Sequence, residues 1–350
     1  MKIAIVGAAG FLGSRSVEYL TLGHGIKTRP IVRKYSDLAR LSRFTVDWRI
    51  ADAMHESELT KAFDGCDFVI HSIMGDNKSI ACCARPAYNA AQAVGIKKII
   101  YISSAAIYDQ LQGSEANESA RIRRSRLGQY SSAKLQAEQE FMSLSSRGSV
   151  KVVALRPSII IGPRSHWIAE PTKQLLTGKV FLADGGVGWC NCIYVDNLID
   201  IALLACHCDT LGSEVFNVDD NRNLTWMQYY EHLATHLGIS HQDIQAVPPP
   251  PPERSRFRST RLFKFLSSCT PPLVKLALRK SALIRHRADD FHHNHSNEGS
   301  LINPIIAALH ITPWQLSTVK LRESLVYKPT VDLDESFRRS IGWLRFAGIL

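Results

Sequence analysis

The pattern of hydrophobic and polar positions along the first 160 residues predicts strands that alternate with helices. Strands are expected over residues 3–6, 27–32, 47–50, 66–72 and 97–103, and the first of them is a wholly apolar run, typical of a strand buried on both faces. Apolar residues recur at helical spacing between them, over residues 11–22, 56–63 and 79–94. Strands that alternate with helices imply right-handed βαβ units. We therefore expect an α/β fold with a doubly wound parallel sheet.

The first predicted strand runs directly into a loop with three glycines, Gly7-Ala-Ala-Gly10-Phe-Leu-Gly13. Gly7 permits a tight turn, Gly10 lets backbone N–H groups approach a pyrophosphate, and Gly13 lets the next helix pack close to the strand. The N-terminus of that helix favours an anion. A plain turn between a strand and a helix is the alternative. The position of the loop after a buried strand favours a dinucleotide-binding Rossmann domain.

The end of the second predicted strand bears on the form of the cofactor. In dinucleotide-binding folds this end meets the adenosine ribose, where an acid bonds the 2′-hydroxyl and an arginine accommodates a 2′-phosphate. The residue here is Arg33, followed by Lys34. We therefore expect NADP in preference to NAD. A solvated basic loop is the alternative.

Three chemically reactive side chains follow the fifth predicted strand. Ser104 stands at its carboxyl end, which in such sheets faces the ligand crevice. Tyr130 and Lys134 lie four residues apart, so on a helix they share one face. An ammonium beside a phenol lowers the phenol pKa from about 10, and a serine hydroxyl can hold the substrate oxygen. The set could move a proton between an alcohol and a ketone while a nicotinamide exchanges hydride; a surface helix pair is the alternative for Tyr130 and Lys134.

These residues, in this order, resemble the extended short-chain dehydrogenase/reductase family, the NAD(P)-dependent epimerases, dehydratases and reductases. The resemblance covers residues 2–237 and extends more faintly to residue 343. Further matching segments are Asp52, Leu155-Arg-Pro-Ser-Ile-Ile-Ile-Gly-Pro163, Ile193-Tyr-Val-Asp-Asn197 and Phe216-Asn-Val218, with Glu138 after the Tyr-x-x-x-Lys motif.

The resemblance implies roles for individual residues. Ser104, Tyr130 and Lys134 would carry the proton chemistry, and Lys134 would also bond the nicotinamide ribose. Asp52 would meet the adenine, and residues 157–160 would line the carboxamide end. The full expected cofactor-binding set is Gly7, Gly10, Phe11, Leu12, Gly13, Arg33, Asp52, Ser72, Tyr130, Lys134, Pro157 and Ile160. For Asp196 we prefer a structural role at a helix cap.

Departures from the family pattern reduce the number of reactions and substrates that we expect for this chain. Ala105, Ala106 and Ile107 follow Ser104 where 4,6-dehydratases have Thr-Asp-Glu, which argues against dehydration. Ser72-Ile-Met74 replaces Leu-Ala-Ala and makes a bulkier wall near the nicotinamide. Cys190-Asn-Cys192 stands where many nucleotide-sugar enzymes carry a basic residue for the diphosphate, which weakens such a substrate without excluding it. We expect these two thiols to point to opposite faces of a strand, and we expect no metal site.

Length and composition limit the classes of protein to which this chain can belong. With 350 residues, 45% of them hydrophobic, the chain can build a full core, and no uncharged apolar stretch is long enough to span a membrane. We expect a Rossmann domain over residues 1–163, to which residues 193–218 return, and a smaller substrate-binding lobe over residues 164–350. The eight cysteines are expected to be free thiols of a cytoplasmic protein.

The net charge of +10 is concentrated in residues 254–287, which hold ten Lys or Arg and no acid. This basic segment mixes apolar and basic residues at helical spacing. It can lie on an anionic membrane surface, or it can form a helical pair that caps the lobe with its basic side outward. No recognition motif accompanies the charge, so we expect no nucleic-acid partner. A homodimer is left open.

The leading hypothesis is an NADP-preferring oxidoreductase that interconverts a secondary alcohol and a ketone on a sugar-like or polycyclic substrate. Three alternatives are kept. The first is a nucleotide-sugar epimerase that retains its cofactor. The second is a hydroxysteroid-dehydrogenase-like enzyme at a membrane surface, and the third is a non-catalytic NADP-binding sensor.

Overall fold

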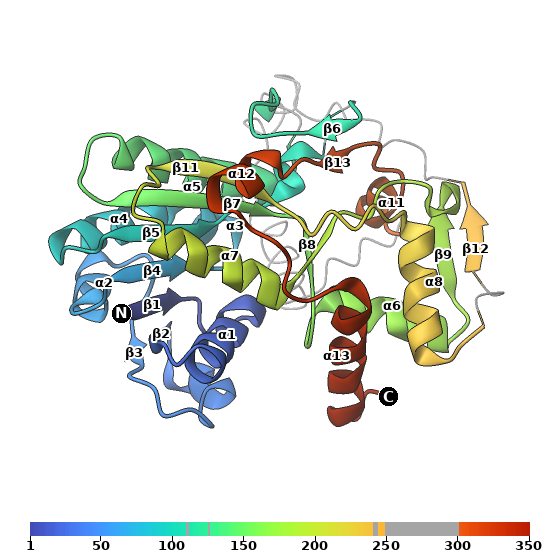
Figure 1. Cartoon of the computed structure of the whole chain (residues 1–350), viewed down its shortest axis with the longest axis horizontal. Helices are drawn as coiled ribbons and strands as arrows, with labels where there is room; N and C mark the ends of the chain where they lie inside the picture. The colour runs from blue at the N-terminus through green and yellow to red at the C-terminus, as the bar shows by residue number, and fades with distance from the viewer. Residues whose placement is uncertain (110, 112, 125–126, 241–243, 249–300) are drawn as a thin grey trace, which may run out of the picture.

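The computed structural model describes residues 1–109, 111, 113–124, 127–240, 244–248 and 301–350 (Figure 1). The basic segment 254–287 and Cys269 lie outside these residues, so both interpretations of that segment stay open. No helix of the described part is long and apolar enough to cross a membrane.

A seven-stranded parallel sheet forms the larger part of the molecule. Its strand order is β11-β7-β5-β4-β1-β2-β3. The strands are β1 (Lys2–Val6), β2 (Lys27–Val32), β3 (Arg49–Ile50), β4 (Phe68–His71), β5 (Lys98–Ile102), β7 (Lys151–Pro157) and β11 (Glu214–Val218). The predicted doubly wound parallel sheet is confirmed. Because all strands run the same way, their carboxyl ends gather at one edge, where ligands bind in such sheets.

Helices cover both faces of the sheet because the strands alternate between two cores. Ile3 and Ile5 of β1 point into one core, and Ala4 and Val6 point into the other. The helices over the first core are α1 (Phe11–Glu18) and α7 (Val195–His207). Those over the second core are α2 (Glu56–Phe63), α3 (Asn77–Cys82), α4 (Ala84–Ala93) and α5 (Gln129–Ser145). The wholly apolar run of residues 3–6 is therefore buried on both faces, while other strands of the sheet also bury polar residues such as Arg29, His71 and Lys98.

Two predicted helices differ from the observed ones. The helix expected over residues 79–94 is broken after Cys82, because Pro86 has no N–H and its ring would clash with the carbonyl of Cys82 in a continuous helix. The helix expected over residues 11–22 ends at Glu18 and continues as one π-helical turn, Tyr19–Gly23. The first of these breaks could have been predicted from the proline.

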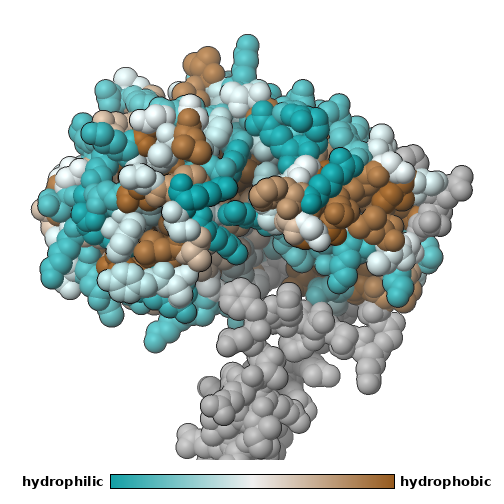
Figure 2. Space-filling view, turned by 90° about the horizontal axis from the view of Figure 1, so that it is seen from below, coloured by the Kyte–Doolittle hydropathy of each residue, from teal (hydrophilic) through white to brown (hydrophobic). Residues whose placement is uncertain are grey.

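A smaller group of elements lies beside the sheet (right side of Figure 1). It contains the parallel strand pairs β8 (Ile159–Ile161) with β10 (Cys192–Tyr194), and β9 (Val180–Ala183) with β12 (Ile244–Val247). Its helices are α6 (His166–Leu176), α8 (Trp226–Leu237), α11 (Pro304–His310) and α13 (Leu333–Phe346). Figure 2 shows hydrophobic side chains on the side of the molecule where this group lies.

The remaining elements are short. They are the 3₁₀ helices η2 (Tyr35–Arg40), η3 (Ala105–Tyr108) and η5 (Asp184–Gly186), the strand pair β6 (Glu115–Ala116) with β13 (Gln315–Leu316), and α12 (Val319–Leu325). Helix α12 packs against β11, and α13 packs against α6 and α8. The end of the chain therefore contacts both parts of the molecule.

Candidate active site

The glycine loop between β1 and α1 is packed so tightly that two of its glycines have no room for a side chain. Gly7 has φ +84°, the left-handed region that favours glycine. A Cβ on Gly13 would lie 2.2 Å from the carbonyl oxygen of Gly7, so only glycine lets α1 pack this close. Gly10 precedes α1, and its N–H donates to the Gly7 oxygen at 3.0 Å. This geometry fits the cradle that a pyrophosphate requires.

Ser104 and Tyr130 meet at the carboxyl edge of the sheet. Ser104 follows β5 and caps η3, where its Oγ accepts a hydrogen bond of 3.2 Å from the N–H of Ala106. Tyr130 is the second residue of α5 and is half-buried. Burial raises the pKa of Tyr130, and a hydrogen bond with the Ser104 side chain opposes that rise. The structure thus places together the serine and the phenol that the sequence separates by 26 positions.

Lys134 lies one turn further along α5, with its side chain buried. Its Nζ donates to the carbonyl oxygens of Ile102 at 2.9 Å and Ile73 at 3.2 Å, the residues where β5 ends and where the chain leaves β4. Burial lowers the pKa of Lys134 to about 8. The expected lowering of the Tyr130 pKa by this ammonium is not seen in the described structure, where burial dominates and the pKa of Tyr130 is raised. The ammonium group of Lys134 is directed to backbone carbonyl oxygens instead.

The lowered pKa of Lys134 predicts a pH dependence of stability. The unfolded lysine has a pKa of about 10.4 and holds its proton above pH 8, where the folded lysine loses it, so stability rises with pH across this window. Replacing Lys134 by Met removes this contribution. We expect wild type to gain roughly 3 kcal/mol of unfolding free energy relative to Lys134→Met between about pH 8 and 10.4. Urea unfolding across this pH range measures the difference. Lys151→Met changes an exposed lysine and is the control, and an equal difference between wild type and this variant would contradict the prediction.

A buried polar network holds the segments that carry these residues. Glu138, one turn beyond Lys134, accepts from Ser103 Oγ at 2.6 Å and from Arg156 Nε and Nη2 at 3.0 and 2.6 Å. Arg156 also donates to the hydroxyl of Tyr108 at 2.5 Å, and that hydroxyl donates to Asn217 Oδ1 at 2.9 Å. The network joins α5 to β5, η3, β7 and β11. The sequence motif contains Glu138, but nothing in its spacing reveals Arg156 as its partner.

The other expected cofactor residues border the same edge of the sheet. Arg33 is exposed directly after β2, and Ser72 directly after β4 donates to the carbonyl oxygen of Val6 at 3.0 Å. Asp52 follows β3, and its Oδ1 accepts from the N–H of Met54 at 2.9 Å. Pro157 ends β7, and Ile160 is the central residue of β8.

The first turn of α1 contributes the last two expected residues. Phe11 begins the helix half-buried, and Leu12 is buried in the core that covers one face of the sheet. All the expected residues therefore lie near carboxyl ends of strands or in the glycine loop, while their contact with a cofactor stays a prediction.

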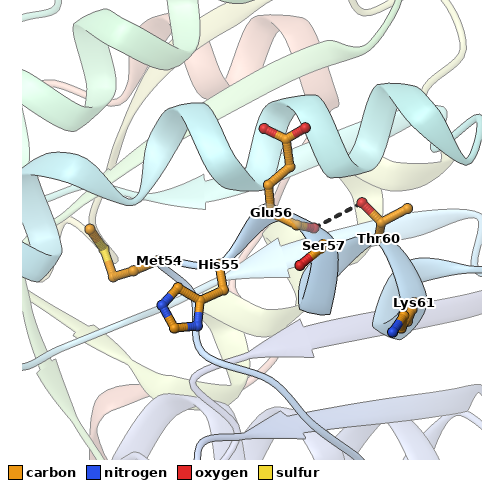
Figure 3. Close-up of a pocket in the computed structure, with 6 residues that line it drawn as sticks. All are labelled: Met54, His55, Glu56, Ser57, Thr60 and Lys61. Atoms are coloured by element: carbon orange, nitrogen blue, oxygen red, sulfur yellow. Dashed lines mark hydrogen bonds between the residues drawn. The ribbon is translucent and has the colours of Figure 1, made fainter.

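An open hollow lies at the beginning of α2, two residues after Asp52. Figure 3 shows the residues that line it, which are Met54, His55, Glu56, Ser57, Thr60 and Lys61. The Thr60 hydroxyl donates to the carbonyl oxygen of Glu56 at 2.8 Å, a contact within the helix. Ser104, Tyr130 and Lys134 do not line this hollow, so it is separate from the three reactive residues.

Asp196 has structural contacts, but it does not cap a helix, because Tyr194 is the N-cap residue of α7. Its carboxylate is fully buried in the first turn of α7 and accepts from Arg15 Nε and Nη2 at 2.7 and 2.8 Å. Arg339 of α13 lies 3.5 Å away. Asp196 therefore ties the helix that follows the glycine loop to α7 and to the last helix.

The expectation for Cys190 and Cys192 is wrong. Residues two apart in an extended segment point to the same face, and the pKa of the Cys190 thiol is raised by burial and further by the neighbouring Cys192 side chain. Both are buried in the core beside Trp226 and Tyr229. Among the described residues, no three His, Cys, Asp or Glu side chains are placed to hold a metal ion.

Comparisons with known proteins identify the family of this chain. A model of the NAD dependent epimerase/dehydratase family matches residues 3–219. The Uncharacterized protein YbjS of Escherichia coli is 24% identical over 100% of this chain and 99% of its own. The N-acetyl-alpha-D-glucosaminyl-diphospho-ditrans,octacis-undecaprenol 4-epimerase of Escherichia coli O157:H7 is 22% identical over 67% of this chain and 72% of its own. The decarboxylating sterol-4-alpha-carboxylate 3-dehydrogenase of Dictyostelium discoideum is 21% identical over 71% of this chain and 80% of its own.

A solved structure supports the fold. The UDP-glucose 4-epimerase of Thermotoga maritima, crystallised with UDP-glucose, superposes with a TM-score of 0.71 at 19% identity and covers 99% of both chains. The named relatives with a stated activity are epimerases and dehydrogenases. This chain is therefore an enzyme of the extended short-chain dehydrogenase/reductase type, and it belongs to the NAD dependent epimerase/dehydratase family.

Proposed function

We propose that this enzyme interconverts a secondary alcohol and a ketone on a sugar-like or polycyclic substrate. The observation that carries the proposal is the approach of the Ser104 and Tyr130 side chains at the carboxyl edge of the sheet, with Lys134 one turn away on the same helix. This edge also holds the glycine loop. The proton-transfer residues and the glycine loop therefore lie at the same edge of the sheet, where ligands bind in such folds.

Each residue has a distinct task in this proposal. The glycine loop and the start of α1 would hold the pyrophosphate of the cofactor, whose nicotinamide supplies or accepts the hydride when bound. Ser104 holds the substrate oxygen. Tyr130 donates a proton to that oxygen during reduction, which suits its raised pKa, since the phenol stays protonated at neutral pH. In the reverse direction Tyr130 takes the proton, and the ammonium of Lys134 stabilises the phenolate.

The chemistry of the substrate lobe supports an alcohol or ketone that carries no diphosphate. We place this lobe in residues 164–350. Asn191, next to the position where a basic residue would hold a diphosphate, is already bonded to the backbone of Trp314 and Leu316. Its neighbours Cys190 and Cys192 are buried in the core. The sterol dehydrogenase among the relatives fits a polycyclic substrate.

A nucleotide-sugar epimerase is the second candidate, because UDP-glucose 4-epimerases are found both among the relatives of this chain and among the solved structures with its fold. The two reactions differ in their net redox change. An oxidoreductase converts cofactor in proportion to substrate, whereas an epimerase reoxidises its cofactor within each cycle.

The purified protein offered 3-hydroxysterols, 3-ketosterols and UDP-sugars in turn separates these candidates. We expect a sterol or another uncharged alcohol to change the absorbance of reduced nicotinamide in proportion to product formed. Conversion of a UDP-sugar to its 4-epimer without a net absorbance change would replace the proposal with the epimerase. The cofactor released from the protein by denaturation gives an independent readout.

Preference for NADP is part of the proposal, and it depends on Arg33. Replacing Arg33 by Ala is expected to weaken NADP⁺ binding about tenfold, because a charge-assisted hydrogen bond to the 2′-phosphate is lost, and to leave NAD⁺ binding unchanged. Fluorescence titration with both cofactors measures this. Equal affinities of the wild type for NADP⁺ and NAD⁺, unaltered in Arg33→Ala, would refute the role, and Arg85→Ala on α4 is the exposed control.

A further inference from the structure

Arg164 has an unusual backbone conformation and forms no ion pair with any other described residue. It lies between β8 and α6 with φ 74°, the left-handed region that favours glycine over arginine. Among the described residues, no hydrogen bond or ion pair joins its half-buried guanidinium. The described contacts therefore do not explain why a charged side chain occupies this position.

The segment that carries Arg164 is packed against the elements that follow the glycine loop. A Cβ on Gly162, two residues earlier, would lie 2.6 Å from Cγ1 of Val195, the first residue of α7. The next residue of α7, Asp196, holds Arg15 of α1 through two hydrogen bonds. Arg164 therefore belongs to a segment fixed close to α1, although it leads into the smaller part of the molecule.

Two further arginines gather at the same place. Arg40 donates from Nη1 to the carbonyl oxygen of Ala9 in the glycine loop at 3.0 Å. Arg43 pairs with Glu18 of α1 at 2.7 Å. The pKa of Arg164 is lowered by burial and then by the charges of Arg43 and Arg40, so the three guanidinium groups are close enough to repel one another.

The nearby acids are already engaged, which leaves the positive charge uncompensated. Glu18 is shared between Arg43 and Arg15, and Asp196 is occupied by Arg15. Like charges that face one another in this way are stabilised by an anion between them. A guanidinium matches the oxygens of a phosphate group with two parallel hydrogen bonds, and the glycine loop beside Arg40 offers backbone N–H groups to the same ligand.

We propose that Arg164 and Arg40 together bind a phosphate group of the dinucleotide cofactor at the glycine loop. The proposal rests on the cofactor binding of the proposed function and assigns to it a residue outside the sheet. Through Arg164 the bound phosphate links the α6 part of the molecule to the Rossmann part. The phosphate is either the pyrophosphate, which NAD and NADP share, or the 2′-phosphate of NADP.

Titration calorimetry of the full chain with NADP⁺ and with NAD⁺ tests the site. Arg164→Gln is expected to weaken binding about tenfold, the loss of one charge-assisted contact. Equal loss for both cofactors assigns the pyrophosphate, and loss for NADP⁺ alone assigns the 2′-phosphate. Arg40→Gln is expected to act on the same cofactor in the same way. Affinities of Arg164→Gln within twofold of wild type for both cofactors would overturn the proposal.

Arg164→Gly separates a binding role from a structural one. Glycine accepts φ 74° without strain, so the Tm of the cofactor-free protein should stay equal or rise by about 2 °C while cofactor affinity falls. An Arg164→Gly protein with unchanged affinity would also overturn the site. Arg147→Gln is the control, since this exposed arginine follows α5 and lies beyond the helix end remote from Tyr130.

These measurements are independent of turnover. If Tyr130→Phe kept full activity, the acid/base assignment would fail while the affinities of the Arg164 variants would be untouched. If the Arg164 variants bound both cofactors like wild type, only the phosphate site would fail.

Discussion

Replacing Tyr130 by Phe is expected to lower kcat about 10²- to 10⁴-fold, the usual range for removal of a general acid or base. Phenylalanine preserves the ring at the start of α5 and removes only the hydroxyl that meets Ser104. Because the proton can then be delivered only by water, hydride transfer is slowed in both directions. Cofactor affinity should change little, since the glycine loop and α1 are intact. Steady-state turnover and a cofactor titration on the same preparation measure the two quantities.

A matched control separates this effect from loss of a buried hydroxyl. Tyr88 of α4 is buried, and its hydroxyl donates to the carbonyl oxygen of Val150 at 3.1 Å, beside the amino end of β7 and away from Ser104. Tyr88→Phe should cost about 1 kcal/mol of stability and leave kcat unchanged. If Tyr130→Phe retained more than a tenth of wild-type kcat, proton transfer would have to be assigned to another group.

Local sequence patterns predicted most of the strands of the sheet. The wholly apolar run of residues 3–6 became the inner strand β1, which is buried on both faces, although other strands of the sheet also bury His71 and Lys98. The meeting of Ser104 with Tyr130 followed from a strand end and a helix start, two positions that the topology brings to one edge. The helix break after Cys82 could also have been predicted, because Pro86 follows it. The common face of Cys190 and Cys192 could have been predicted from their spacing of two residues.

Contacts between distant segments were beyond the same rules. The hydrogen bonds from Lys134 to Ile73 and Ile102 depend on where two strands stop and how their carbonyl groups turn. The pairing of Glu138 with Arg156 requires that α5 pack on β7 with one particular register. A helix motif and a strand motif each display one member of such a pair, and neither spacing shows the other. Pair contacts of this kind fix the position of the Lys134 side chain and hold α5 against β5 and β7.

Glu138→Leu is expected to lower the free energy of unfolding by roughly 3–5 kcal/mol, the cost of leaving a buried charge without its partner. Arg156 is 7% exposed at its side chain and Glu138 only 3%, so neither water nor salt can replace the lost carboxylate. Ser103 and Tyr108 would remain beside an unpaired guanidinium. Urea unfolding at neutral pH measures the loss.

The same helix offers an exposed ion pair as the control. Glu140 pairs with Arg85, and their side chains are 34% and 64% exposed. Glu140→Leu should cost less than about 1 kcal/mol, because water solvates both charges. A similar loss in the two variants would show that the leucine disturbs α5 itself and that the buried pair has no special role.

The double variant Glu138→Leu with Arg156→Met decides between a lost attraction and an orphaned charge. If the penalty arises from the buried guanidinium left alone, removing it should restore most of the stability, since apolar replacements of buried pairs are often neutral. Restored stability should not restore activity. Without the bonds from Glu138 to Ser103 and Arg156, the β5 end and α5 can shift relative to each other, so kcat should stay reduced while the unfolding midpoint recovers. Recovery of both would assign the network to folding alone; recovery of stability with low kcat would make Glu138 a positioning residue for Ser104 and Tyr130.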